Sequence, residues 1–423
     1  MKTIDRQPTA ENARLVVDKP IDPTSFRRRR WIGSEVGDWV EVPRKWNEPR
    51  YWLDWGTVKG PLPVIKGKIG RVVVVIPVHN EVDTIAKTVG SILGQTRPPD
   101  EVYVLVDNVY DRELGNAIAE RLAQFDVRVT QNVTNDHRKA GNLNIALEKI
   151  LPNLSETDVV MGFDADSVPD RNFIANTVAW LEKGYGSVGA TFHGRPGGGM
   201  LGTLQRAEFA RFARHQHRRT RCDVLSGTGW AARVSVLRLV ASTRSNGQVY
   251  DVQSLVEDYE LTLTLKRKRI PVTAPGDCLV LTDVMESMRD WITQRLRWQH
   301  GTIEELRRCG WSHESRDMII RQTVTYLGML ALPLTAFYLI WSFVLFGWEG
   351  INPLNAKLYM ICIAVIICEQ AWQARKAGWW AVICAMLIFP DLLYSIARQW
   401  VYIRALWRSL RRKKSHWGAG TNI

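Results

Sequence analysis

Short β-branched runs that alternate with helical segments restrict most strongly how this chain can fold. The run Val72–Ile76 contains only β-branched residues, which is typical of a strand that is buried on both faces. Strands of this kind joined by helices form a mostly parallel sheet covered on both sides, so the sequence predicts an α/β fold. The expected strands are Val72–Ile76, Val102–Val106, Val127–Val129 and Val159–Phe163, and the expected helices between them are Glu81–Leu93, Glu113–Gln124 and Ala140–Ile150.

Polar residues stand at the ends of three of these expected strands. In a parallel sheet the carboxyl ends of the strands meet at one edge, where ligands bind. The triplet Asp164-Ala165-Asp166 is a candidate site for Mg²⁺ or Mn²⁺, because both cations bind carboxylate and phosphate oxygens together. The same triplet also occurs by chance in loops. The strand-end residues are Pro77, Asn80, Glu81, Asp107, Asp164 and Asp166.

Two further residues have both a chemical and a purely structural interpretation. Lys139 precedes a helix and is either a point charge for a phosphate group or an ordinary solvated lysine. Asp258 follows Glu257 at the start of the expected helix Tyr259–Lys266. A carboxylate there either caps the helix or accepts the proton of a reacting hydroxyl group. Spacing alone does not decide between the two.

The segment Gln294–Trp298, which reads QRLRW, is the most specific indication of function in the chain. Arginine side chains chelate a diphosphate, and a tryptophan face can stack on a sugar ring. The alternative is an amphipathic helix whose basic residues face lipid phosphates. The segment lies in an expected helix, Trp291–Arg307, and a second helix with many basic residues is expected at Leu201–Arg219.

Three apolar segments lie between residues 324 and 397. Val324–Gly347 holds 24 residues without a charge, which is long enough to cross a bilayer. Leu358–Trp372 is a shorter candidate span that includes Glu369. Ala377–Ala397 is interrupted by Pro390, so a re-entrant or interfacial broken helix is expected there. Buried helices are the alternative for the second and third segments.

Charge distribution favours a membrane over nucleic acid as the partner of this basic chain. The net charge is +13, and residues 398–423 contribute seven basic and no acidic residues directly after the apolar segments. Lysine and arginine flank the apolar region on both sides, which predicts a multi-pass protein of the cell membrane with a cytoplasmic polar domain and tail. The polar N-terminus gives no expectation of a signal peptide. The six cysteines lack metal-binding spacing, so free thiols are expected.

These features divide the chain into four expected regions. Residues 1–66 form a preamble rich in tryptophan and arginine, which lies either at a membrane interface or as a strap on the next domain. Residues 67–315 form the α/β domain with interfacial helices, residues 316–400 the membrane region, and residues 401–423 a basic cytoplasmic tail.

The motifs together resemble those of family 2 glycosyltransferases, in particular the membrane synthases of cellulose, chitin, hyaluronan and poly-N-acetylglucosamine. The resemblance covers residues 70–302 and implies a Rossmann-like nucleotide-sugar-binding domain of the GT-A type. The matching pieces, in the family's order, are VVVVIPVHNE, YVLVDN, KAGNLN, DAD, SGTGW, VEDYEL and QRLRW.

The resemblance implies a role for each matching residue. Asp166 would ligate Mg²⁺ or Mn²⁺, and Asp258 would be the catalytic base. The residues that would bind the nucleotide-sugar are Pro77, Asn80, Glu81, Asp107, Lys139, Asp164, Arg295 and Arg297. The residues that would border the acceptor are Gly227, Thr228, Gly229 and Trp298.

The implied reaction is an inverting transfer of a sugar, with a UDP-sugar as the expected donor, to an acceptor hydroxyl, which gives a β-glycosidic bond. Processive polysaccharide synthesis, single transfer to a lipid-linked acceptor and an inactive membrane scaffold remain as alternatives. Asn108 stands where the family usually has a second aspartate, which leaves donor preference open. Few helices are expected for a polymer channel, so a homo-oligomer or a partner membrane subunit is also expected.

Overall fold

A computed structural model describes residues 67–107, 112–132, 135, 137–217, 222–347 and 353–411. The preamble of residues 1–66 lies outside the described residues, as do Asn108 and residues 412–423 of the basic tail. The expectations for these segments stay predictions.

A seven-stranded sheet forms the centre of the α/β domain, in the order β3-β2-β1-β4-β8-β6-β9. Strand β1 is parallel to β2 and β4, and β2 is parallel to β3, whereas β8 is antiparallel to β4 and β6. The expected mostly parallel sheet is therefore confirmed. The strands are β1 Val72–Val78, β2 Glu101–Asp107, β3 Arg128–Asn132, β4 Val159–Gly162, β6 Ser187–Gly189, β8 Trp230–Arg233 and β9 Val272–Thr273.

Helices cover both faces of this sheet because successive side chains of a strand point to opposite faces. In β1, Val72, Val74 and Ile76 join one core cluster, which also contains residues of α2, α3 and α5. Val73 and Val75 join a second cluster with α4, α7 and α8. The helices are α2 Val82–Leu93, α3 Arg112–Leu122, α4 Arg138–Ile150, α5 Phe173–Glu182, α7 Val234–Ser242 and α8 Glu257–Arg267, with the 3-10 turn η2 at Leu151–Asn153.

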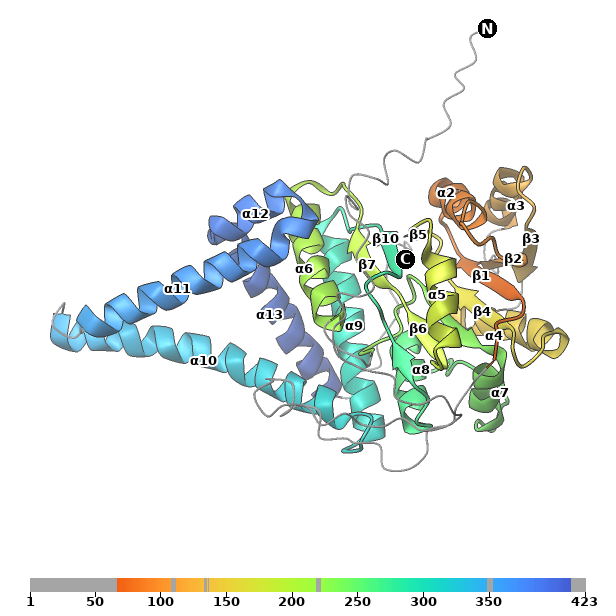
Figure 1. Ribbon diagram of the computed structural model, residues 1–423. Helices are drawn as coiled ribbons and strands as arrows, with labels where there is room; N and C mark the ends of the chain where they lie inside the picture. The colour runs from red at the N-terminus through yellow and green to blue at the C-terminus, as the bar shows by residue number, and fades with distance from the viewer. Residues whose placement is uncertain are drawn as a thin grey trace, which may run out of the picture.

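A three-stranded sheet in the order β5-β10-β7 lies beside the large one (Figure 1). Its strands have only two to four residues, so they carry too few side chains to give a hydrophobic period in the sequence. They are β5 Val168–Pro169, β7 Thr191–Gly194 and β10 Leu279–Thr282.

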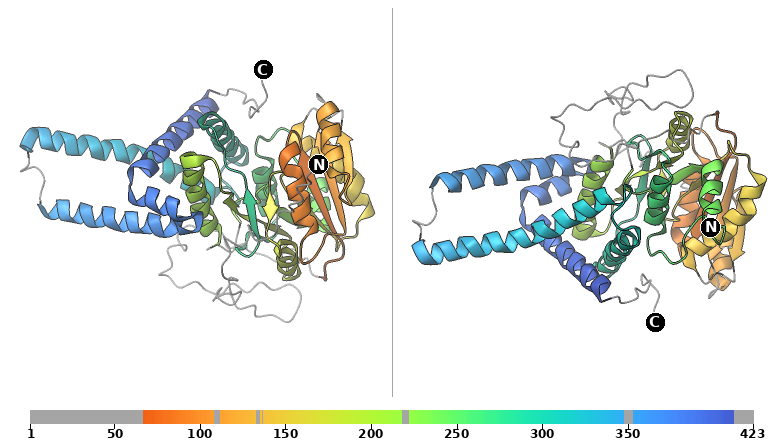
Figure 2. Two further views of the ribbon diagram at one scale, coloured as in Figure 1. Left: turned by 90° about the horizontal axis from the view of Figure 1, so that it is seen from above. Right: turned by 90° about the horizontal axis from the view of Figure 1, so that it is seen from below.

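The remaining helices form an all-helical region on one side of the sheets. In all three views α10 and α11 project in the same direction, away from the α/β domain, and α6, α9, α12 and α13 lie at their base (Figures 1 and 2). These helices are α6 Gly199–His217, α9 Met288–Cys309, α10 Arg316–Phe346, α11 Pro353–Ala374, α12 Trp379–Met386 and α13 Phe389–Leu410, with the 3-10 turn η4 at Arg375–Ala377.

One bent pair of helices in the described part of the chain could span a membrane by length and composition. Among the described residues no single helix is long and apolar enough to cross a bilayer, whereas α12 and α13 together pass by length and composition, with an 85° bend between them. The expected spans Val324–Gly347 and Leu358–Trp372 fall in α10 and α11, and neither helix passes alone. The break expected near Pro390 is confirmed, because α12 ends at Met386 and α13 begins at Phe389.

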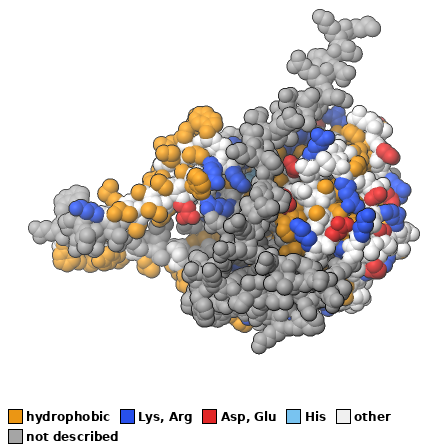
Figure 3. Space-filling model, viewed as in Figure 1, with side chains coloured by type: hydrophobic (Ala, Val, Ile, Leu, Met, Phe, Trp, Pro, Cys, Tyr) orange, Lys and Arg blue, Asp and Glu red, His pale blue; other side chains and the backbone are white. Residues whose placement is uncertain are grey.

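Apolar side chains gather on the outside of the helical region. Figure 3 shows hydrophobic side chains over its projecting helices and mixed charges over the α/β domain. On α10 the exposed large side chains include Leu327, Leu330, Phe337, Ile340 and Val344. A contiguous apolar surface of this kind marks a membrane or protein interaction site.

Candidate functional site

The parallel pairing of β1, β2 and β4 brings three polar segments to one edge of the large sheet. Val78 at the end of β1 pairs with Val106, one residue before Asp107, and β4 ends at Gly162, two residues before Asp164. Thr84 and Thr88 of α2 both donate a hydrogen bond to the carbonyl of Ala165, at 3.2 and 2.8 Å. Helix α2 therefore fixes the loop that carries Asp164 and Asp166.

Lys139 lies between Asp164, an expected site residue, and Glu257. Its Nζ is 2.5 Å from Oδ1 of Asp164 and 3.2 Å from Oε1 of Glu257. Burial alone would lower the pKa of Lys139, but Asp164 and Glu257 outweigh it and raise the pKa above its ordinary value. Lys139 is thus a positive charge held at a fixed place, and the interpretation of it as a freely solvated lysine is wrong.

Gly227 closes this cluster. A Cβ added at Gly227 would lie 2.6 Å from Nζ of Lys139 and 3.2 Å from Oδ2 of Asp164, so only glycine fits without displacing them. The backbone N–H of Gly227 donates a 3.2 Å hydrogen bond to Oδ2 of Asp258. The structure therefore brings together Lys139, Asp164, Gly227 and Asp258, which the sequence places far apart.

Asp258 occupies the first turn of α8, where it is half-buried beside the acidic Glu257. Its Oδ1 accepts a 2.7 Å hydrogen bond from the backbone N–H of Tyr259. Burial and the nearby Glu257 raise the pKa of Asp258 to about 6, although Lys139 opposes them. A carboxylate with a pKa near neutrality is suited to take a proton from a reacting group.

Asp166 lies in the most acidic part of the site. Its Oδ2 accepts a 3.3 Å hydrogen bond from Thr282 of β10. Burial, followed by Asp164, Asp283 and Glu81, raises the pKa of Asp166 to about 7. A carboxylate within electrostatic reach of three others, as Asp166 is, attracts a divalent cation.

The donor set around Asp166 suits a cation that the substrate helps to bind. In the described part of the chain, no three or more His, Cys, Asp or Glu side chains are grouped as ligands of one metal ion. Mg²⁺ commonly takes one or two protein carboxylates and completes its shell with water and substrate phosphate. Asp166, together with the neighbouring Asp164, fits that pattern.

The residues after β1 form a bend at the same edge, where β2 ends at Asp107. Oε2 of Glu81 accepts hydrogen bonds from the backbone N–H groups of His79 (2.8 Å) and Asn80 (3.0 Å). Asp107 accepts a 2.9 Å hydrogen bond from Nδ2 of Asn135. Pro77 lies within β1 and is half-buried, and Asn80 is exposed.

Two groups of residues were missed by the sequence analysis. Glu257 was considered only as a neighbour of Asp258, yet it holds Lys139. Asn142 and Asn144 are buried in α4, where they hydrogen-bond to the backbone of Leu105 and Tyr250, respectively. The signal in the sequence was the presence of two asparagines within one expected helix. If such an amide side chain is buried, it must form hydrogen bonds to other parts of the protein.

The two arginines of QRLRW have different environments. Arg295 is only 3% exposed, and its Nη2 is 2.9 Å from Oε2 of Glu208 on α6. A guanidinium that is buried and paired in this way has little capacity left for a diphosphate, so the structure does not favour Arg295 as a donor ligand. Arg297 is half-buried, as is Trp298, which packs against the clusters around Phe209 and Leu306. Their roles stay predictions.

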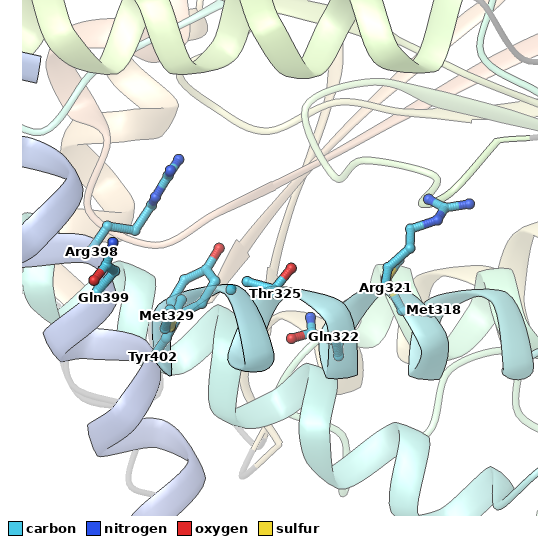
Figure 4. Close-up of a pocket in the computed structure, with 9 residues that line it drawn as sticks. Met318, Arg321, Gln322, Thr325, Met329, Arg398, Gln399 and Tyr402 are labelled. Atoms are coloured by element: carbon cyan, nitrogen blue, oxygen red, sulfur yellow. The ribbon is translucent and has the colours of Figure 1, made fainter. Parts of the chain in front are cut away.

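A separate cavity of about 410 Å³ lies between α10 and α13 (Figure 4). None of the strand-end residues lines it, so it is distinct from the carboxylate cluster. Arg321, at one end, is 2.7 Å from Oδ2 of Asp223, and Arg398 stands at the other end. The lining residues are Met318, Arg321, Gln322, Thr325, Gly328, Met329, Arg398, Gln399 and Tyr402.

The chain is similar to several known glycosyltransferases over limited lengths. It is 34% identical to cellulose synthase 1 of Komagataeibacter xylinus over 123 residues, which are 29% of this chain and 7% of that protein. It is 23% identical to glucomannan 4-beta-mannosyltransferase 1 of Oryza sativa subsp. japonica over 67% of this chain and 55% of that enzyme. The chain thus spans half or less of the length of most such relatives.

One similar solved structure is a mannosyltransferase from Pyrobaculum calidifontis in complex with GDP-Man and Mn²⁺. It has 18% sequence identity and a TM-score of 0.48, and the match covers 84% of this chain and 92% of that one.

Two family descriptions match the sequence itself. Glycosyl transferase family 2 matches residues 73–240, which include β1, β2, β4 and the Lys139–Asp164 pair. Glycosyl transferase family group 2 matches residues 159–407, from the strand before Asp164 through Asp258 and QRLRW to α13. Because the second match alone covers more than half of the chain and contains Asp166, Asp258 and the QRLRW segment, the chain belongs to the family 2 group of glycosyltransferases.

Proposed function

We propose that this glycosyltransferase transfers a sugar from a nucleotide-sugar, with a UDP-sugar as the expected donor, to an acceptor hydroxyl and inverts the anomeric configuration. The observation that carries the proposal is the cluster in which Lys139 joins Asp164 to Glu257 and Gly227 joins the cluster to Asp258. The ammonium group of Lys139, the carboxylate of Asp258 with its raised pKa, and Gly227 therefore lie together near the carboxyl end of β4. Ligands of such sheets bind at this end of the strands.

The proposed mechanism uses one base. Asp258 accepts the proton of the acceptor hydroxyl, and the oxygen attacks the anomeric carbon from the side opposite the diphosphate. The bond between that carbon and the diphosphate breaks, and its electron pair leaves with the phosphate oxygen. Direct displacement inverts the configuration, so an α-linked donor gives a β-linked product.

The reaction also requires that the negative charge on the departing diphosphate be stabilised. Lys139 is fixed close to Asp164, where the nucleotide is expected, and its charge would stabilise the departing diphosphate. A divalent cation at Asp166 would supply further positive charge there. Pro77, Asn80, Glu81 and Asp107 are proposed to hold the nucleoside, and Arg297 to meet the diphosphate. Thr228 and Gly229 are proposed to border the acceptor.

The acceptor is proposed to be either a growing glycan or a lipid-linked molecule. Trp298 at the half-buried end of QRLRW supports a sugar-stacking surface and hence a glycan. The cavity between α10 and α13 supports a lipid-linked acceptor, because Arg398 lines it beside the exposed apolar residues of α10. Guanidinium groups suit the phosphate of such a lipid.

A donor screen tests the proposal. Purified protein is incubated with UDP- and GDP-sugars, an acceptor mixture and Mg²⁺ or Mn²⁺, and nucleoside diphosphate release is measured. Release above the rate of Asp258→Asn is expected with one donor, and excess chelator should stop it until the cation is restored. No release from any donor would overturn the proposed activity, and full activity in chelator would remove the metal role of Asp166.

A further inference from the structure

Glu208 of α6 is a half-buried carboxylate with partners on two other helices. Its Oε2 accepts hydrogen bonds from Nη2 of Arg295 at 2.9 Å and from the hydroxyl of Tyr394 at 2.5 Å. Its Oε1 is 3.8 Å from Nη1 of Arg398. Helices α6, α9 and α13 are far apart in the sequence and meet at this one carboxylate.

Arg295 connects this ion pair to the aromatic residue of QRLRW. Its guanidinium carbon lies 4.4 Å from the ring centroid of Trp298 and 5.3 Å from that of Phe209. Its Nη1 also donates a 2.7 Å hydrogen bond to Oε1 of Gln294. A planar guanidinium that stacks on an indole restricts the orientation of the indole, and the guanidinium is itself held in place by Glu208.

Tyr394 attaches the same group to α13. Its hydroxyl accepts a 2.9 Å hydrogen bond from Nε1 of Trp291 while it donates to Glu208. The two rings are 5.0 Å apart, and Trp291 is fully buried. Glu208 is therefore bonded on both sides, by the QRLRW helix and by the second helix of the bent pair.

We infer that Glu208 is a positioning residue: it orients Arg295, which fixes the ring of Trp298 at the acceptor side of the site. The inference rests on the proposed function. It also explains why Arg295 is buried, since the residue acts on the acceptor side through Trp298 rather than on the donor diphosphate.

The charge state of Glu208 supports this arrangement. Burial alone would raise the pKa of Glu208, but Arg295 and Arg398 outweigh it and lower the pKa below its ordinary value. The group is thus ionised at neutral pH and makes charge-assisted hydrogen bonds, which are shorter and stronger than neutral ones. Glutamine has nearly the same shape but cannot provide the negative charge.

The test is a ratio of two rates in Glu208→Gln. Transfer to the acceptor requires a correctly placed Trp298, whereas hydrolysis of the donor by water does not. The ratio of transfer to hydrolysis should fall roughly ten-fold, as it should in Trp298→Ala, because stacking energies of about 1.4 kcal/mol correspond to that factor. The KM for the acceptor should rise more than the KM for the donor.

Arg211→Gln is the matched control. Nη2 of Arg211 is 3.1 Å from Oδ1 of Asp391, so this pair also joins α6 to α13, one helical turn from Glu208. Its loss removes a partly buried charge from the same helix contact without touching Arg295 or Trp298. Thermal stability should fall in both variants, but the ratio should stay within about two-fold of the original in Arg211→Gln.

Arg295→Lys gives an independent measurement if Glu208→Gln does not fold. Lysine keeps the charge opposite Glu208 but not the planar group over Trp298, so the ratio should fall while folding is retained. An unchanged ratio in either folded variant, or an equal fall in Arg211→Gln, would overturn the inference. Failure of the proposed function is a different result, namely no transfer by the unaltered protein.

Discussion

Asp258 combines a helix-start position with a chemical environment that its sequence position does not reveal. It accepts a hydrogen bond from the backbone N–H of Tyr259 in the first turn of α8, yet burial and the neighbouring Glu257 raise its pKa against the opposing charge of Lys139. The structural and the catalytic interpretations are therefore compatible. A substitution that keeps the shape but removes the basic oxygen separates them.

We expect Asp258→Asn to abolish transfer while donor binding survives. Asparagine retains a carbonyl oxygen for the N–H of Tyr259 but cannot accept a proton, so the rate should fall by about 10²–10⁴-fold. The transfer rate is measured from the amount of product formed, and donor affinity is measured by calorimetry. Near-normal turnover would show that Asp258 is only a structural residue.

The rate should also depend on pH with an acidic limb near 6. A base acts only as the carboxylate, and the pKa of Asp258 is raised to about 6, so kcat/KM should fall about ten-fold per pH unit below that value. The pKa of Asp166 is raised to about 7, so cation binding should weaken below pH 7. Excess Mg²⁺ should reverse the second effect but not the first. A profile flat down to pH 5 would contradict both.

Individual site residues could be predicted from the sequence where strand ends bring them together. Asp107, Asp164 and Asp166 follow apolar strands, and pairing of neighbouring parallel strands places them on one edge. The environment of Arg295 could not be predicted, because its partner Glu208 is 87 residues away on another helix. No local pattern shows whether a basic residue on an amphipathic helix faces a ligand or a buried acid.

At the scale of elements, α13 has one face directed to the protein and another to the outside. Val401, Ala405 and Ser409 are buried, spaced four residues apart on one side of the helix. The exposed side carries aromatic residues with arginines over their rings, namely Arg404 on Trp400 and Arg411 on Trp407. Tryptophan and arginine together are typical of helices that lie in a membrane interface.

We expect the double variant Ile403→Glu, Trp407→Glu to bind anionic lipid vesicles more weakly. Both side chains are exposed, and each apolar group that no longer enters lipid should cost about 1.5–3 kcal/mol, or roughly ten-fold in affinity or more. Leu239→Glu, at an exposed apolar residue of α7, is the control and should change nothing. Unchanged vesicle flotation of the double variant would exclude α13 as a membrane contact.

Most of the longer elements were predicted, but the helices α5 and α7 and the strands after β4 were not. The four expected strands correspond to β1 to β4, and the expected helices of the α/β domain to α2, α3, α4, α6, α8 and α9, with ends shifted by a few residues. Strands β5, β6, β7, β9 and β10 have four residues or fewer and depend on pairing with distant partners. Hydropathy identified α10 and α11 as helices, but not how they are arranged.

At the scale of the whole molecule, we propose that the α/β domain and the C-terminal tail lie on the same, cytoplasmic side of a membrane. Basic residues precede α10 and follow α11, and seven lie between residues 398 and 423. A cysteine introduced at position 415 should react with an impermeant reagent only after the cells are opened. Labelling of intact cells would require an odd number of crossings. A homo-oligomer or a partner subunit remains part of this proposal for a polymer product.

The bend between α12 and α13 affects on which side of a membrane the C-terminal tail lies, and it depends on one backbone torsion angle. Ile388 links the two helices with φ at +61°, a left-handed conformation that a β-branched residue seldom adopts. A continuous straight helix would need this residue to return to negative φ, and the contacts of α13 with α6 and α9 would then be lost. The direction in which the chain leaves the apolar region is therefore set by the backbone of one isoleucine, a property that no scale of residue hydrophobicity contains.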